Sequence, residues 1–152
     1  MSLQSVREYF QQHAPDLNVI VTEASSATVA LAAEAHGVEP DQIAKTICVR
    51  LVDEVALVVT AGTKRLDNRK FKDRFGTKPR MLDAEAVVAA TSHPVGGVCP
   101  FGLPSPLQVY CDISLRAFDI VIPAAGATNA AVRIAPARMG ELTRAEWVDL
   151  CQ

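Results

Sequence analysis

The stretch KTICVRLVDEVALVVTA, residues 45–61, decides the fold. It contains two runs rich in β-branched and apolar residues, 45–52 and 54–61, which are separated by Asp53. Two such runs joined by a short polar break are typical of a β-hairpin. We therefore predict that the central sheet starts with this hairpin.

The chain before the hairpin predicts two helices with a short strand between them. Apolar and aromatic residues recur at helical spacing up to His13, and a proline ends that run. NVIV (18–21) is predicted to be a short strand. The second helix is expected to begin at a cap on Ser25 or Ser26, to run through TVALAAEAH and to end at Gly37, since glycine favours the left-handed conformation.

The residues after the hairpin predict two helices with aspartate or asparagine caps. Asp67 or Asn68 is expected to cap a basic helix that closes at Gly76. Asp83 is expected to cap the alanine-rich run AEAVVAAT (84–91).

The last third of the chain predicts strands followed by one helix. Thr143 and Glu146 have the spacing of a capping box, which predicts a final helix through Trp147 and Leu150. The predicted strands are LQVYC (107–111), DIVIPAA (119–125) and AAVRIA (130–135).

These elements predict the fold class. Strands that cluster as hairpins between helices favour an α+β domain over a doubly wound one. We expect a single domain over residues 1–152, with a mixed, mostly antiparallel sheet flanked by helices. A chain of 152 residues with 49% hydrophobic content is long enough to bury a core.

The cysteines and the N-terminus carry expectations about the environment. The four cysteines form no Cys-x-x-Cys pair and only three histidines accompany them, which disfavours a metal site or a disulfide framework. Free thiols are typical of a reducing cytoplasm. No signal-peptide pattern and no run near the roughly 18 apolar residues of a membrane span occur. We therefore expect a cytoplasmic protein with neither a membrane nor DNA as a partner.

Positive charge gathers in KRLDNRKFKDRFGTKPR, residues 64–80. This segment has eight basic and two acidic residues, a charge of +6, whereas the rest of the chain has seven basic and fifteen acidic residues and carries −8. A basic patch on an acidic body suits a polyanion. The alternative is a solvated helix face, which is the more common state of a charge run taken alone.

The loop GGVCPFGLP, residues 96–104, combines two adjacent glycines with two prolines. Gly96 and Gly97 can adopt backbone angles closed to other residues and let a ligand approach the main chain. Pro100 and Pro104 stiffen the rest of the loop. The N–H groups of such a loop could bind an oxyanion or a carbonyl, and the alternative is a structural loop packed by Phe101.

Three further residues could carry chemistry, and each has a structural alternative. Lys45 begins an apolar strand, where its ammonium either snorkels to the sheet edge or points into a cleft. Asp112 could simply cap a turn. Cys99 could be a nucleophile, although the sequence assigns it no base and leaves open whether His93, six residues earlier, lies near it; a plain, partly buried thiol is the more common state.

Four motifs together resemble one family. AKTICVR (44–50), GGVCPFGLP, VYCDISL (109–115) and IPAAGATNAAVRI (122–134) occur in an order and at separations similar to those of the YbaK/ProX family of aminoacyl-tRNA deacylases. These are relatives of the editing insertion domain of bacterial prolyl-tRNA synthetase. The resemblance runs from about Val19 to Leu142. It implies a single mixed α/β domain that acts at the acceptor end of aminoacyl-tRNA without a metal or cofactor, with an aminoacyl-tRNA synthetase such as prolyl-tRNA synthetase as an optional partner.

The resemblance also implies roles for single residues. Lys45 matches the lysine at the pocket mouth, and Gly96 and Gly97 match the loop that cradles the ester, so these three are predicted to be catalytic. Cys99 departs from the serine often found at its position, which bears on amino-acid preference. The residues predicted to bind substrate are Thr46, Val98, Cys99, Pro100, Phe101, Gly102, Asp112, Ala125 and Gly126, and those predicted to bind tRNA are Lys64, Arg65, Arg69, Lys70 and Lys72.

The predicted reaction is hydrolysis of the ester of a mischarged small amino acid, Cys, Ala or Ser, on tRNA-Pro. The 2′-hydroxyl of the terminal adenosine is expected to take part, and a small-residue pocket that includes Ala124 would suit such side chains. Editing is needed because one methylene provides only about 1–3 kcal/mol of discrimination in a synthetase. The alternatives are a non-catalytic module that binds an aminoacyl end or a synthetase, and a hydrolase that depends on Cys99.

Overall fold

The predicted hairpin lies at the centre of the structure, a computed structural model that describes residues 2–152. β2 (Ile43–Arg50) pairs antiparallel with β3 (Val55–Ala61), and Lys45 lies opposite Thr60. In the turn between them the Leu51 N–H donates to the carbonyl oxygen of Glu54 over 2.7 Å. The prediction of a hairpin is confirmed.

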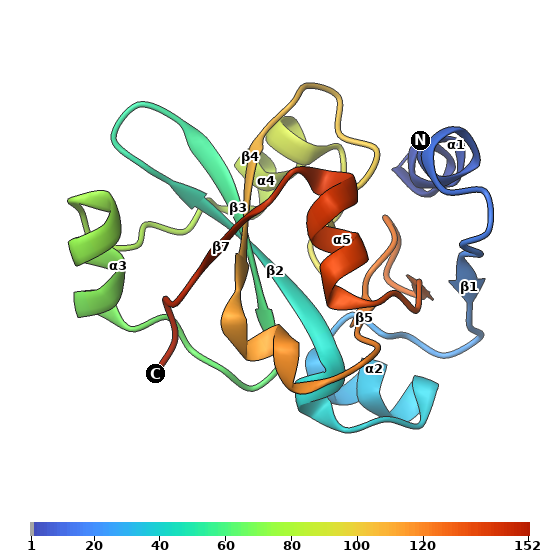
Figure 1. Cartoon of the computed structure of the whole chain (residues 1–152). Helices are drawn as coiled ribbons and strands as arrows, with labels where there is room; N and C mark the ends of the chain where they lie inside the picture. The colour runs from blue at the N-terminus through green and yellow to red at the C-terminus, as the bar shows by residue number, and fades with distance from the viewer. Residues whose placement is uncertain (1) are drawn as a thin grey trace.

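The hairpin belongs to a five-stranded sheet with the order β5-β2-β3-β4-β7, which crosses the middle of the molecule in Figure 1. β4 (Gln108–Asp112), β5 (Ile122–Pro123) and β7 (Glu146–Val148) each run parallel to their neighbours. The sheet is mixed, as predicted, but the expectation that it is mostly antiparallel is wrong, because three of its four strand pairings are parallel. The physical reason is that long crossovers return the chain in the same direction, whereas short turns reverse it.

Helices and short ladders surround the sheet. The ladder of β1 (Ile20–Val21) with β6 (Ala130–Ala131) is antiparallel and lies beside α1, far from α3 in Figure 1. Within residues 2–152, no helix combines the length and the apolar character needed to cross a bilayer. The helices are α1 (Ser2–His13), α2 (Val29–His36), α3 (Asn68–Phe75), α4 (Ala84–Thr91) and α5 (Pro136–Thr143), with short 3-10 helices η1 (Pro40–Gln42) and η2 (Ile113–Ala117).

The two faces of β2 pack against different parts of the molecule. Side chains alternate along a strand. Ala44 and Cys48 belong to the main core cluster, together with residues of α1 and α5. Val49 packs with Phe71 of α3 in a second cluster. The side chains of Lys45 and Thr46 therefore lie on opposite faces of β2.

The predicted caps of α3 and α4 and the glycine ends of α2 and α3 are confirmed. Asp67 accepts from the N–H groups of Arg69 and Lys70, and Asp83 caps α4 through the N–H of Ala86. Gly37 and Gly76 end α2 and α3 in the left-handed conformation, as predicted.

The start of α2 differs from the prediction, since the cap is Thr28 and not Ser25 or Ser26. The Leu31 N–H donates to Thr28 Oγ1 over 3.2 Å. The hydroxyl of Ser26 instead donates to the carbonyl of Thr128, 3.2 Å away, so it holds the chain to a distant segment.

The predicted C-terminal helix is wrong. Thr143 ends α5, where its hydroxyl donates to the carbonyl of Met139, and Glu146 begins β7. The proline at the first position of α5 is the start signal that the capping-box prediction overlooked. The predicted strands at 18–21, 119–125 and 130–135 are shortened to the two-residue strands β1, β5 and β6, with single bridges of Val121 to Ile134 and of Ala124 to Ala131.

Candidate functional site

A cavity of about 410 Å³ lies at the edge of β2. Its walls are mostly apolar, and they come from α2 and the residues before it, from β2 and β5, from the segment around Leu82, and from the glycine-rich loop. The lining residues are Ser26, Ala27, Thr28, Val29, Ala32, Ile43, Ala44, Lys45, Thr46, Ile47, Cys48, Met81, Leu82, Val87, Val95, Gly96, Val98, Ile122, Ala124, Ala130 and Ala131.

The cavity lies where the outer edge of β2 is open. β5 pairs only with Ile43 and Ala44, and the next cover comes from Leu82, whose N–H donates to the Cys48 carbonyl over 3.3 Å. Residues that direct their main chain away from the antiparallel partner alternate along a strand. Thr46, two residues before Cys48, therefore directs its N–H and C=O toward the open edge.

The side chain of Thr46 is a second polar group at this edge. Its hydroxyl oxygen is buried, and no described residue forms a hydrogen bond with it. A buried polar group without a partner costs about 1–3 kcal/mol, so native proteins rarely keep one without a reason. Thr46 thus offers a ligand three hydrogen-bonding groups inside a mostly apolar wall.

The glycine-rich loop forms the opposite wall and is held by close packing. Gly96 has φ +90, and a Cβ there would lie 2.8 Å from the Cβ of Ala27. A Cβ on Gly97 would lie 2.7 Å from the main-chain nitrogen of Ala127. Both positions therefore require glycine, for conformation and contact at Gly96 and for contact at Gly97.

The N–H groups of this loop are not equivalent. The N–H of Gly97 donates to the carbonyl of Pro94 over 2.8 Å, and the Gly97 carbonyl accepts from Gly126. Gly97 does not line the cavity and supports its neighbours. Gly96 and Val98 do line it, and neither of their N–H groups donates to another group within residues 2–152. They are the oxyanion-binding candidates of this loop.

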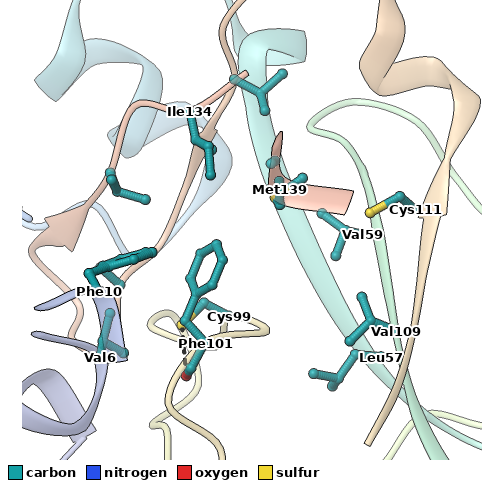
Figure 2. Packing of buried hydrophobic residues seen from close by; sticks show 14 of the residues in the cluster. Val6, Phe10, Leu57, Val59, Cys99, Phe101, Val109, Cys111, Ile134 and Met139 are labelled. Carbon is teal, nitrogen blue, oxygen red and sulfur yellow. Dashed lines mark hydrogen bonds between the residues drawn. The ribbon is translucent and has the colours of Figure 1, made fainter. Parts of the chain in front are cut away.

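Cys99 and Phe101 are core residues. Both side chains are 0% exposed, and Figure 2 shows Phe101 between α1, with Val6 and Phe10, and the side chains of the sheet. The Phe10 and Phe101 rings lie 4.7 Å apart between centroids. Burial raises the pKa of the Cys99 thiol to about 12. Because the thiolate is the nucleophile, the structure argues against the Cys99-dependent hydrolase.

His93 holds this core loop to two other segments. It is 0% exposed, and its Nε2–H donates to the Phe101 carbonyl over 2.8 Å, with Cys99 Sγ 3.5 Å from the same nitrogen. Its other ring nitrogen, Nδ1, is in hydrogen-bond contact with the Ser2 hydroxyl oxygen, which also lies 2.6 Å from the Gly126 carbonyl oxygen, so these two acceptors share the one hydroxyl proton. Burial lowers the pKa of His93. His93 therefore fixes the loop against α1 and against the turn at Gly126.

Lys45 lines the cavity, but its ammonium is already bound. Nζ donates to the carbonyl of Lys64 over 2.8 Å, and burial lowers the pKa of the amine. Alternation along β2 places Lys45 on the face of Val49 and opposite Thr46. Lys45 thus lines the cavity, while its charged end is held on the α3 side of the sheet.

The remaining predicted substrate residues divide between the cavity and the core. Asp112 is 1% exposed, and its two oxygens accept from the N–H groups of Ser114 and Leu150, so it is the turn cap of the structural alternative. The structure brings Lys45, Thr46, Gly96, Val98 and Ala124 together around the cavity, whereas Gly97, Cys99, Pro100, Phe101, Gly102, Asp112, Ala125 and Gly126 do not line it.

The predicted tRNA-binding residues lie on α3 and the chain before it. Arg65, Arg69 and Lys72 are exposed. Lys70 is exposed but engaged, since Nζ lies 3.0 Å from Asp149 and donates to the Cys151 carbonyl over 2.7 Å. Lys64 is half-buried, with its carbonyl bound to Lys45. That hydrogen bond connects the start of this segment with Lys45, a residue that lines the cavity.

Sequence reasoning missed much of the cavity wall. Ala27, Val29 and Ala32 come from α2 and the residues before it, and Met81 and Leu82 come from the segment that pairs with the end of β2. These are ordinary small or apolar residues without a motif, and only the fold brings them together.

Comparison with known proteins identifies related sequences. Residues 23–142 match the aminoacyl-tRNA editing domain family. The uncharacterized protein YwhH of Bacillus subtilis (strain 168) is 44% identical over 154 residues, which cover 100% of this chain and 98% of YwhH. A proline–tRNA ligase of Shouchella clausii (strain KSM-K16) is 32% identical over 118 residues, which are 76% of this chain but 21% of the ligase.

Solved structures share the fold. That of a "putative trans-editing enzyme for prolyl tRNA synthetase" has 31% sequence identity and a TM-score of 0.92, and the match covers 99% of this chain and 97% of the other. The hypothetical protein APE2540 has 31% identity and a TM-score of 0.89, with 97% and 99% of the two chains covered.

Proposed function

The chain belongs to the aminoacyl-tRNA editing domain family, and we propose that it is a trans-acting deacylase that hydrolyses the ester of a mischarged small amino acid on tRNA-Pro. One observation carries the proposal. The mostly apolar cavity at the open edge of β2 is lined by Thr46, Gly96 and Val98, and among residues 2–152 neither the Thr46 hydroxyl nor the N–H groups of the other two have a hydrogen-bond partner. An aminoacyl ester has the polar and apolar parts that such a wall would hold.

The chemistry needs no side-chain nucleophile from the protein. The ester is already activated, so a water oxygen bonds to the carbonyl carbon while the carbonyl oxygen takes up negative charge. The N–H groups of Gly96 and Val98 stabilise that charge. The bond to the 3′ oxygen then breaks, and the 2′-hydroxyl of the terminal adenosine passes the proton from the water to the leaving oxygen.

Thr46 and Lys45 position the substrate in this scheme. The hydroxyl and main chain of Thr46 pair with the polar groups of the aminoacyl moiety, as an added strand would pair with the edge of β2. Lys45 lines the cavity, and its ammonium is proposed to exchange the Lys64 carbonyl for the acceptor end of the tRNA.

Small side chains in the wall suit a small amino acid. Ala27, Ala44, Ala124 and Gly96 bring main chain close to the cavity. Alanine, cysteine and serine are the proposed acyl groups, and proline is proposed to be excluded by the width of its ring. A prolyl-tRNA synthetase is the proposed partner, supplying tRNA with the wrong amino acid attached.

The experiment that tests this site is single-turnover hydrolysis of alanyl-, cysteinyl- and seryl-tRNA-Pro by the wild type and two variants. Thr46→Ser keeps the hydroxyl and is expected to retain most of the rate. Thr46→Val keeps the shape but not the hydroxyl, and it is expected to lower the rate by about tenfold or more, since a hydrogen bond removed from a buried site costs about 1–3 kcal/mol. Equal rates for all three proteins would remove Thr46 from the site.

A further inference from the structure

A second hollow lies apart from the cavity at β2. Its volume is about 630 Å³, and it is formed by η2, α5 and the chain that leads into β7. It shares no lining residue with the first cavity. Its lining residues are Arg116, Ala137, Gly140, Glu141, Arg144, Ala145 and Trp147.

Two arginines in this hollow have no ionic partner among residues 2–152. Neither Arg116 nor Arg144 takes part in a salt bridge or a side-chain hydrogen bond there. On α5, by contrast, the Arg138 guanidinium holds both carboxylate oxygens of Asp16. Glu141 is the one acidic residue in the lining, so the hollow carries a net positive charge.

Arg116 is held in place by an aromatic ring. Its guanidinium carbon lies 4.2 Å from the centroid of the Trp147 ring. The ring itself lies against Gly140, where a Cβ would be 3.0 Å from the indole nitrogen. Stacking on a ring leaves the N–H edge of a guanidinium free for a second partner. Trp147 therefore supports Arg116 and is not itself the free stacking surface.

Arg144 is placed at a backbone position that favours glycine. It is the C-cap of α5 with φ 54, and its N–H donates to the carbonyls of Gly140 and Glu141. The left-handed conformation is sterically unfavourable for a residue with a Cβ. Gly37 and Gly76 are the left-handed C-caps of α2 and α3, and glycine adopts this conformation without a steric penalty. The side chain of Arg144 is present despite a backbone that suits glycine better.

We propose that this hollow binds a phosphate group of the tRNA backbone, as a contact separate from the cavity and from the basic face of α3. Guanidinium groups are donors only, and their planar fork fits phosphate oxygens in pairs. A phosphate is favoured over a base because the ring that could stack on a base is covered by Arg116. The proposal rests on the proposed tRNA substrate.

The test is binding of uncharged tRNA to the full chain, measured by fluorescence anisotropy across a series of salt concentrations. Arg116→Gln combined with Arg144→Gly is expected to weaken binding and to flatten the dependence of log K on log salt by about 0.7 to 0.9 for each phosphate that is no longer neutralised. Arg144→Gly also relieves the backbone, so the fold is expected to persist. Arg138→Gln, which removes a charge from α5 outside the hollow, is the matched control.

The outcomes decide between the proposal and its rivals. A slope in the double variant equal to that of Arg138→Gln would overturn the proposal. Equal competition by a polyglutamate peptide and by RNA at matched charge would overturn the assignment to nucleic acid. If the wild type binds tRNA through these arginines but hydrolyses no ester, this contact stands and the proposed deacylase function fails.

Discussion

Thr46 and Lys45 are adjacent in the sequence, and their side chains lie on opposite faces of β2. The family resemblance predicts that the lysine is catalytic, and its ammonium donates a hydrogen bond to the carbonyl of Lys64. The threonine was predicted only as a substrate contact, but its hydroxyl is buried and has no hydrogen-bond partner among residues 2–152. Sequence could place both residues at the start of a strand. Which face holds the cavity depends on packing that the sequence does not display.

Replacing Thr46 with valine is expected to stabilise the free protein. The hydroxyl is buried without a partner in the part of the chain that the structure describes, so its removal should raise the free energy of unfolding by about 1 kcal/mol, while Thr46→Ser should leave it nearly unchanged. Urea denaturation measures both. A valine variant less stable than the wild type by a similar amount would mean that the hydroxyl has a partner in the free protein.

Cys99 is expected to resist alkylation in the native protein. Its thiol is 0% exposed and its pKa is raised by burial to about 12, so little thiolate forms near neutral pH. Iodoacetamide treatment followed by peptide mapping should find Cys99 unmodified and hydrolysis retained. Mapping also separates an adduct on Cys48, which lines the cavity and could block it. Loss of activity in step with labelling of Cys99 would restore the cysteine-dependent hydrolase.

Among the elements, those with local signals were predictable. The hairpin, the caps at Asp67 and Asp83 and the glycines that end α2 and α3 all depend on residues close in sequence. The parallel pairing of β3 with β4 and of β4 with β7 depends on long crossovers. The wrong prediction of a C-terminal helix has the same origin, because the strand that begins at Glu146 forms by pairing with β4, which is distant in the sequence.

The glycine-rich loop gives a prediction about packing. Gly97→Ala places a Cβ 2.7 Å from the main chain of Ala127, so two backbone segments must move apart, at a cost of about 3 kcal/mol. Gly76→Ala is the matched control, because it meets only open space and its cost comes only from its φ of +76, about 1–2 kcal/mol. Thermal unfolding of both variants measures the difference. A smaller destabilisation by Gly97→Ala than by Gly76→Ala would show that the loop is not tightly held.

At the scale of the whole molecule, charge is divided between a basic α3 region and an acidic remainder. The segment 64–80 carries +6 and the rest of the chain −8. That division could be predicted from the sequence. The ion pairs of Lys70 with Asp149 and of Arg74 with Glu146 could not, and they show that part of the basic charge is used to hold the C-terminal segment.

The basic region is expected to set the salt dependence of tRNA binding. Lys70→Gln with Lys72→Gln should weaken binding similarly across tRNAs and flatten the salt slope by about 0.7 to 0.9 for each phosphate that is no longer neutralised. Arg7→Gln on α1 provides a control that removes a charge elsewhere on the molecule. If the slope of the double variant matches that of the control, α3 is a solvated face and does not bind tRNA.

The proposed deacylase function is tested most directly by a hydrolysis assay with the wild type and with Lys45→Ala, each with and without EDTA. The substrates are alanyl-, cysteinyl-, seryl-, threonyl- and prolyl-tRNA-Pro. We expect fast, EDTA-insensitive hydrolysis of one small non-cognate ester, survival of prolyl-tRNA, and loss of the activity in the variant. Survival of every ester at high protein concentration would contradict the proposed deacylase function and favour a module that binds aminoacyl-tRNA without turnover.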